Sequence, residues 1–104
     1  MRCKRMSSLE RIIKKNRELF RSIAIRFLKE RRRGIQKELS EINRRIGAFE
    51  KKYGTFDNFS RSMQDGFDAH EIWFEWKSLI ELRKELQKEL KEIEEAAREL
   101  IREK

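Results

Sequence analysis

Few side chains in this sequence have the types and spacing that catalysis requires. His70 is the only histidine and Cys3 the only cysteine, so a His–His metal pair, a metal site with two thiolate ligands and a Ser-His-Asp set with a spare base cannot be built within one chain. We expect His70 to lie in the first turn of a helix, among four carboxylates: Asp65, Asp68, Glu71 and Glu75. Acids are favoured at helix starts by the helix dipole. We therefore interpret them as caps and first-turn charges, and we expect no enzyme activity, no cofactor and no metal.

The other residues with chemical potential are cations gathered in the first third of the chain. Residues 1–33 hold thirteen Lys and Arg against three acids, whereas residues 34–104 hold fourteen against sixteen. Clustered cations release counterions when they contact phosphates, so DNA or RNA is a candidate partner. The candidate contacts are Lys14, Lys15, Arg17, Arg21, Arg31, Arg32 and Arg33. The interpretation that we favour is a solvated helix face partly neutralised by acids of the final helix, since no aromatic residues at base-stacking spacing accompany these cations.

Most of the aromatic residues lie close together in the second half of the chain, between Tyr53 and Trp76. They support two interpretations that can coexist. The rings could fold onto a short connecting segment and close one end of the molecule, or some could remain as anchors for a partner or for a second copy, because exposed Trp and Tyr clusters commonly supply interface hot spots. Phe67 belongs to this group, and the partner-binding candidates are Tyr53, Phe56, Phe59, Trp73, Phe74 and Trp76.

The composition predicts that long charged helices position these residues. The chain has no proline, four glycines and 44% charged residues, a combination that favours an all-α fold. Ser7 precedes Glu10 by three residues, which is a capping-box pattern, so we expect a first arm over about residues 8–52. Its apolar positions are Leu9, Ile13, Phe20, Ile23 and Phe27, with Asn16 as a polar exception, and then Ile35, Leu39, Ile42, Ile46, Phe49 and Tyr53. The second set is out of phase with the first by about one residue, so we expect a kink or a weaker turn near Gly34.

The chain is expected to reverse in a connector over residues 53–68. Gly54 stands where a left-handed residue ends a helix, and Thr55 can cap a short helix from Phe56 to Gln64. Asp68 precedes Glu71 by three residues, a second capping pattern, and opens a second arm over residues 69–102. Its apolar residues follow heptad-like spacing: Ile72, Trp76, Leu79, Leu86, Leu90, Ile93, Ala97 and Leu100.

Two arms of equal length predict an antiparallel, coiled-coil-like helical hairpin that forms a single domain, residues 1–104. Pairing residues 69–102 with residues 52–19 brings acids of the second arm close to bases of the first. The acids are Glu92, Glu94, Glu95 and Glu99, and the bases are Arg21, Arg26, Lys29 and Arg31. Residues before about 19 project beyond the pairing in this register. The apolar seam exceeds what one thin hairpin can bury, so we also expect two copies to dimerise into a four-helix bundle.

The turn region resembles a group of small prokaryotic helical proteins. The residues that carry the resemblance are Lys52-Tyr53-Gly54-Thr55-Phe56 with Phe59, and then Trp73 and Glu75-Trp76-Lys77-Ser78-Leu79. The group has a Lys-Tyr-Gly-x-Phe-x-x-Phe turn and an acidic-Trp-x-x-Leu segment that opens a Glu/Lys/Leu-rich helix, and many members are regarded as antitoxin components of two-gene toxin–antitoxin modules. The resemblance spans about residues 20–95. It departs from the group at Arg61-Ser62-Met63, where members often carry a more acidic loop.

These observations favour a non-catalytic protein-interaction module. The resemblance implies a cognate toxin as partner, while the cations and the surplus apolar seam leave a nucleic-acid-binding protein and a structural homodimer as alternatives. A single cysteine and the lack of a long apolar run predict a cytoplasmic protein that does not enter membranes. Abundant Lys, Arg, Glu and Ile with few Asn and Gln are typical of proteins from hot-living organisms.

Overall fold

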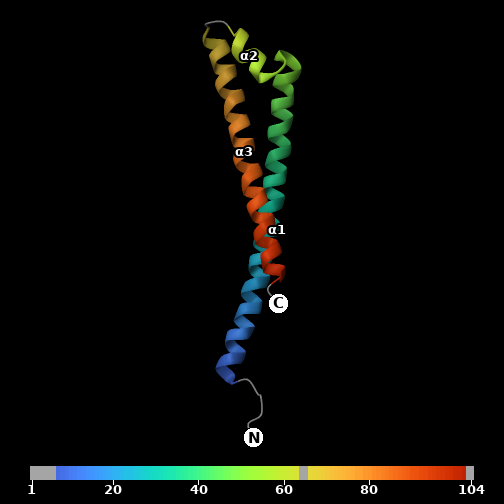
Figure 1. The fold of residues 1–104 in the computed structure, drawn as a ribbon, viewed down its shortest axis with the longest axis vertical. Coiled ribbons are helices and arrows are strands. Elements are labelled where there is room, and N and C mark those ends of the chain that lie inside the picture. The colour runs from blue at the N-terminus through green and yellow to red at the C-terminus, as the bar shows by residue number, and fades with distance from the viewer. Residues whose placement is uncertain (1–6, 64–65, 103–104) are drawn as a thin grey trace.

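The computed structural model describes residues 7–63 and 66–102, which form three α-helices and no strand (Figure 1). α1 covers Ser8–Tyr53, α2 covers Phe56–Ser62 and α3 covers Phe67–Arg102. α1 and α3 run antiparallel, and α2 lies across the end where the chain reverses. The radius of gyration is 23.5 Å, against about 13 Å for a compact domain of this length. The expected all-α hairpin with a short helix in its connector is therefore confirmed, as an elongated rod.

α1 begins and ends at the residues that the sequence indicated. Ser7 is extended, and its side chain accepts a hydrogen bond from the Glu10 amide at 3.1 Å, which satisfies one of the free donors at a helix start. The helix ends at Gly54, whose φ of 85° and ψ of −149° fall in a region that essentially only glycine populates. Between these ends α1 is continuous, and Gly34 lies inside it without interrupting the helix.

The connector differs from expectation in its boundaries. The Thr55 side chain caps α2 by accepting from the Asn58 amide at 3.2 Å, as expected. α2 then ends at Ser62, and the predicted end at Gln64 lies outside the described residues. The prediction that Asp68 caps the last helix is wrong, because Phe67 is already helical and Asp68 lies in the first turn of α3. Its carboxylate still stands near the positive end of the helix dipole.

The core is a single seam between α1 and α3. Ile35, Ile42 and Ile46 of α1 are buried against four residues of α3: Trp76, Leu79, Leu86 and Ile93. These α1 residues follow spacings of seven and four, so they lie on one face of the helix. Buried residues therefore occupy α1 only from Ile35 onward, and half-buried Leu28 marks the edge of the cluster.

Ion pairs connect the two long helices across this seam. Arg31 donates two hydrogen bonds of 3.0 Å to the Glu89 carboxylate, Arg32 lies 3.9 Å from Glu94, and Arg45 pairs with Glu75. Glu94 and Arg31 belong to the acids and bases that were expected to meet across the hairpin. Each pairs with a residue outside those predicted groups: Glu94 with Arg32, and Arg31 with Glu89. In all three pairs the base belongs to α1 and the acid to α3.

Candidate partner-binding surface

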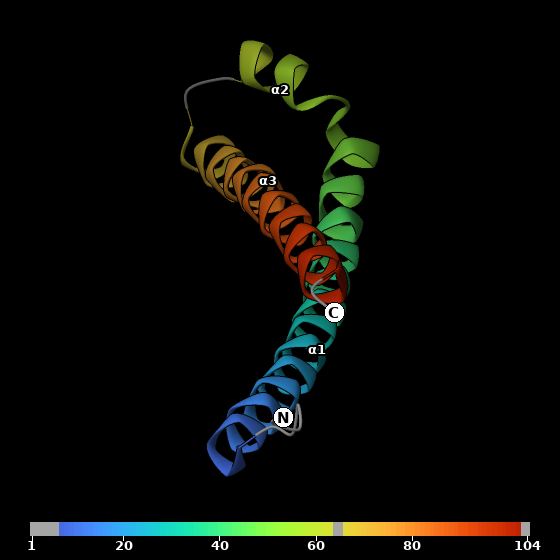
Figure 2. The ribbon, with the colours of Figure 1, turned by 60° about the horizontal axis from the view of Figure 1, so that its bottom comes forward.

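The N-terminal part of α1 extends past the end of α3. Two views show the first turns of α1 beyond the C-terminal turns of α3, with α2 at the opposite end of the rod (Figures 1 and 2). Leu100, near the end of α3, borders the same groove as Phe20 of α1. Residues 11–20 are exposed throughout. The expectation that the residues before about 19 project beyond the hairpin is therefore confirmed.

The projecting part of α1 and the turns directly after it carry large apolar side chains that are mostly exposed. Seven of them are between 44% and 74% exposed. At about 100° per residue their positions fall within about 120° of the helix circumference, so they share one face of the helix. We call this face the N-terminal stripe; its members are Leu9, Ile12, Ile13, Leu19, Phe20, Ile23 and Phe27.

The change in apolar phase explains why this stripe is not buried. The half-buried positions before Ile35 include Leu28, Ala24 and Arg21, which continue the core face toward the N-terminus at spacings of seven, four and three. The stripe residue Ile23 stands one position from Ala24, and one residue turns a helix by about 100°. Consequently α3 packs against one side of α1, while the stripe faces sideways and away from it.

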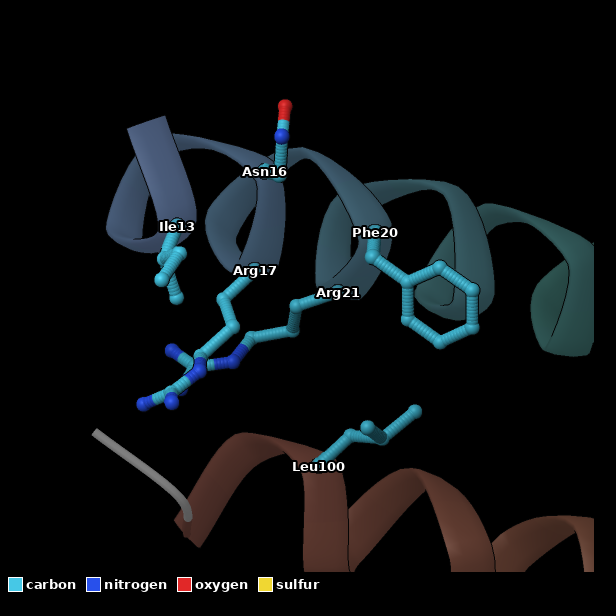
Figure 3. Close-up of a pocket in the computed structure, with 6 residues that line it drawn as sticks. All are labelled: Ile13, Asn16, Arg17, Phe20, Arg21 and Leu100. Carbon is cyan, nitrogen blue, oxygen red and sulfur yellow. The ribbon is translucent and has the colours of Figure 1, made fainter. Parts of the chain in front are cut away.

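An open groove joins the stripe to the end of α3. Its volume is about 530 Å³. Phe20 lies over Leu100, and the guanidinium groups of Arg17 and Arg21 lie side by side next to Ile13, whereas Asn16 points away (Figure 3). The groove is thus apolar at its centre and cationic at its rim.

The seven cations predicted as nucleic-acid contacts fall into two groups. Arg31 and Arg32 form ion pairs with acids of α3. The hydrogen bonds that Arg31 donates to Glu89, together with the charge of Glu89, raise the pKa of the Arg31 guanidinium. Within residues 7–63 and 66–102, the other five form no ion pair: Lys14, Lys15, Arg17, Arg21 and Arg33.

The aromatic residues close the other end of the hairpin. Trp76 is fully buried, and its ring centroid lies 5.2 Å from that of Phe56, 5.3 Å from Phe49 and 5.6 Å from Phe59. Tyr53 packs on the same cluster, and the Trp73 indole donates a 2.9 Å hydrogen bond to the Ser60 hydroxyl. This arrangement is the end-closing plug that the sequence suggested.

The plug removes most of the predicted aromatic anchors from the surface. Tyr53, Phe56, Phe59 and Trp73 are half-buried, and of the six candidates only Phe74 is mostly exposed, at 62%. Phe67, seven residues earlier on the same face of α3, is 78% exposed. The larger exposed apolar surface is the N-terminal stripe, which the sequence-based site prediction omitted although the phase change and the projecting segment both pointed to it.

Glu75 and His70 have structural partners in the part of the chain that the structure describes. Glu75 pairs with Arg45, and the His70 amide donates to the Gly66 carbonyl in the first turn of α3. Cys3 and Asp65 lie outside the described residues. Across residues 7–63 and 66–102, no three His, Cys, Asp or Glu side chains stand together as metal ligands would, and none of the helices there has the length and hydropathy to span a membrane.

Comparison of the chain with protein-family models, with curated proteins and with solved structures gives no match. The basis for assigning a function is therefore the geometry of the N-terminal stripe and its cations.

Proposed function

We propose that this chain is a non-catalytic interaction module that binds a partner protein through the N-terminal stripe. The observation that carries the proposal is the row of seven exposed apolar side chains on the face of α1 that α3 leaves uncovered. Contiguous apolar patches of this size on a surface mark interaction sites. Side chains exposed to this degree present on the order of 100 Å² each. The stripe is therefore comparable to the roughly 800 Å² that one partner contributes to a standard interface.

The physics of isolated helices supports the same proposal. The first turns of α1 lack the packing that stabilises most protein helices, and a helix without tertiary contacts is marginal in water. A partner that lies along the stripe would supply this packing. Binding would then order a segment whose helical state otherwise depends on Ser7 at its start and on the continuous helix behind it.

The more specific proposal is an antitoxin-like role, in which the partner is the toxin of a two-gene module. Its support is the Lys-Tyr-Gly-x-Phe turn. In this chain each turn residue has a structural role that explains its type: Tyr53 ends α1, Gly54 has a positive φ, and Phe56 packs on Trp76. The motif therefore builds the hairpin end and leaves the opposite, projecting end for the partner.

Co-expression with the product of the adjacent gene tests the proposal. The variant Phe20→Gln with Ile23→Gln removes the centre of the stripe, and Phe74→Gln is the matched control, because Phe74 is exposed to a similar degree at the other end of the molecule. We expect the neighbour to co-purify with the wild type and with the control, and to be lost from the double variant. Failure to co-purify, with no toxicity from the neighbour, contradicts the antitoxin role, and equal capture by all three chains contradicts the stripe as the binding surface.

A nucleic-acid-binding function is the second candidate, and the five cations without an ion pair favour it. It predicts an affinity for DNA or RNA that falls steeply with salt and that weakens in the charge reversal Lys14→Glu, Lys15→Glu and Arg17→Glu. Absence of any mobility shift at low salt removes it.

A further inference from the structure

The charges beside the N-terminal stripe all have one sign over most of its length. Lys15 stands three and four residues from stripe members Ile12 and Leu19, and Arg17 stands three and four residues from Phe20 and Ile13 on the other edge. Neighbours at these spacings lie side by side on a helix. Acids stand beside the stripe only at its ends, where Glu10 lies three residues from Ile13 and Glu30 three residues from Phe27. Glu18 faces away from the stripe, because two positions along the helix, from Glu18 to Phe20, amount to a turn of about 200°. The middle of the stripe therefore lies between Lys15 and Arg26 on one edge and Arg17 on the other.

The hairpin already shows which kind of helix α1 accepts. Where α1 is covered, its cover is α3, and the three ion pairs between the two helices among the described residues are Arg31–Glu89, Arg32–Glu94 and Arg45–Glu75. Each joins a base of α1 to an acid of α3. Beyond the end of α3 the cations of α1 continue as Lys14, Lys15 and Arg17, and these three have no ion pair with any residue that the structure describes.

Resting on the proposed function, we propose that the partner segment is an acidic amphipathic α-helix of another protein, which lies along the N-terminal stripe. Its apolar side would cover the stripe, and glutamates or aspartates on its flanks would face Lys15, Arg26 and Arg17. The stripe from Leu9 to Phe27 is about 27 Å long at 1.5 Å per residue. The partner helix therefore needs about five turns, and its middle lies beside the groove that Ile13, Phe20 and Leu100 line.

The same charges disfavour the two competing occupants. A second copy of this segment would bring its own cations against those beside the stripe, and like charges at flanking positions of paired helices destabilise the pair. A nucleic acid would satisfy the cations through its phosphates but would leave the aliphatic stripe residues uncovered. Only Phe20 and Phe27 offer rings for base stacking, and they stand about 10 Å apart along the helix.

Two synthetic peptides test the inference on the full chain. The first is an acidic helix of about 20 residues with Leu at heptad positions a and d and Glu on the flanks, and the second has Lys in place of every Glu. Binding is measured by fluorescence anisotropy at about 50 mM and about 500 mM salt. We expect the acidic peptide to bind at least about tenfold more tightly than the basic one at low salt, and this preference to shrink at high salt.

Variants of the chain show where the peptide binds and distinguish the contribution of charge to its affinity from that of apolar packing. Phe20→Gln with Ile23→Gln should weaken the acidic peptide about tenfold, and Lys15→Glu with Arg17→Glu should reverse the preference between the peptides. Lys37→Glu with Lys84→Glu is the control for net charge; both lysines are exposed and lie away from the stripe, and this pair should change the affinity by less than about twofold. Circular dichroism of each variant shows whether the hairpin is intact.

The alternative outcomes distinguish the two levels of the proposal. Equal binding of the acidic and basic peptides overturns the acidic partner and leaves the stripe as the binding surface. Binding of neither peptide overturns both. A dimer that light scattering detects and that Phe20→Gln with Ile23→Gln dissociates identifies a second copy as the occupant, and DNA binding that survives this double variant identifies a nucleic acid; each result refutes the acidic helix.

Discussion

Two isoleucines of α1 provide a matched test of where the hairpin ends. Ile35 is fully buried, whereas Ile23, twelve residues earlier in the same helix, is 57% exposed. The substitutions Ile35→Ala and Ile23→Ala remove the same atoms from the same type of secondary structure. Any difference between their effects on the free energy of unfolding therefore reports the packing of each site and cannot come from helix propensity.

The structure sets the two magnitudes far apart. Ile35 is fully buried in the core seam between α1 and α3, and truncating a buried isoleucine to alanine costs about 2–5 kcal/mol. That is a large share of the roughly 5–15 kcal/mol by which a small domain is stable. Ile23 loses little on truncation, since exposed substitutions usually change stability by less than about 0.5 kcal/mol, and alanine is the better helix former.

Urea unfolding monitored by circular dichroism at 222 nm measures both values. With a slope of about 1–3 kcal/mol per molar urea, we expect Ile35→Ala to lower the midpoint by about 1–2 M and Ile23→Ala to leave it within experimental error. Repeating the titration over a range of protein concentrations is the control for self-association. Equal losses at both sites would refute the assignment of Ile23 to an uncovered face, and an Ile23→Ala loss that grows with concentration would show that a second copy covers it.

Three further predictions concern the rest of the hairpin. Gly34→Ala should stabilise the chain by about 0.5–1 kcal/mol because its Cβ meets open space inside a helix, whereas Gly54→Ala should destabilise it by about 1–3 kcal/mol because of its positive φ; paired urea titrations show the opposite signs. Ser60→Ala should cost about 0.5–1.5 kcal/mol by removing the acceptor of the indole hydrogen bond, and the same titration would contradict this if the midpoint did not move. The hydrogen bond that Arg44 donates lowers the pKa of Glu41 below its ordinary value of 4.5, so the pair stabilises the fold above that value and this stabilisation is lost as pH falls through the lowered pKa. The difference in melting temperature between wild type and Glu41→Gln should therefore be seen at pH 7 and vanish in acid. A difference that persists in acid would show that it does not come from the ionised Glu41.

Much of the fold followed from local patterns in the sequence. The Ser7 and Thr55 caps, the positive φ of Gly54 and the seam from Ile35 to Tyr53 each depend on residues within one or two turns, and such patterns can be read without tertiary information. The cap assigned to Asp68 failed for the same reason, because a helix start is only specified within one or two residues.

The candidate site was less accessible to sequence reasoning. The apolar residues Leu9 to Phe27 and Ile35 to Tyr53 have similar spacing, and a one-residue change of phase can mean a kink or a second face. Which of the two holds depends on the position of α3, whose described helix ends at Arg102 and does not reach the first turns of α1. The aromatic candidates were misleading in the opposite sense, since a buried ring such as Trp76 and an exposed one such as Phe74 have the same appearance in sequence.

Amide hydrogen exchange along α1 tests most directly whether α3 leaves the N-terminal stripe uncovered. Amides of residues 36–49, next to the core, should exchange only when the whole hairpin opens, whereas amides of residues 12–23 should exchange orders of magnitude faster through local opening. Uniform slow exchange over both ranges, in a chain that light scattering shows to be monomeric, would contradict the account.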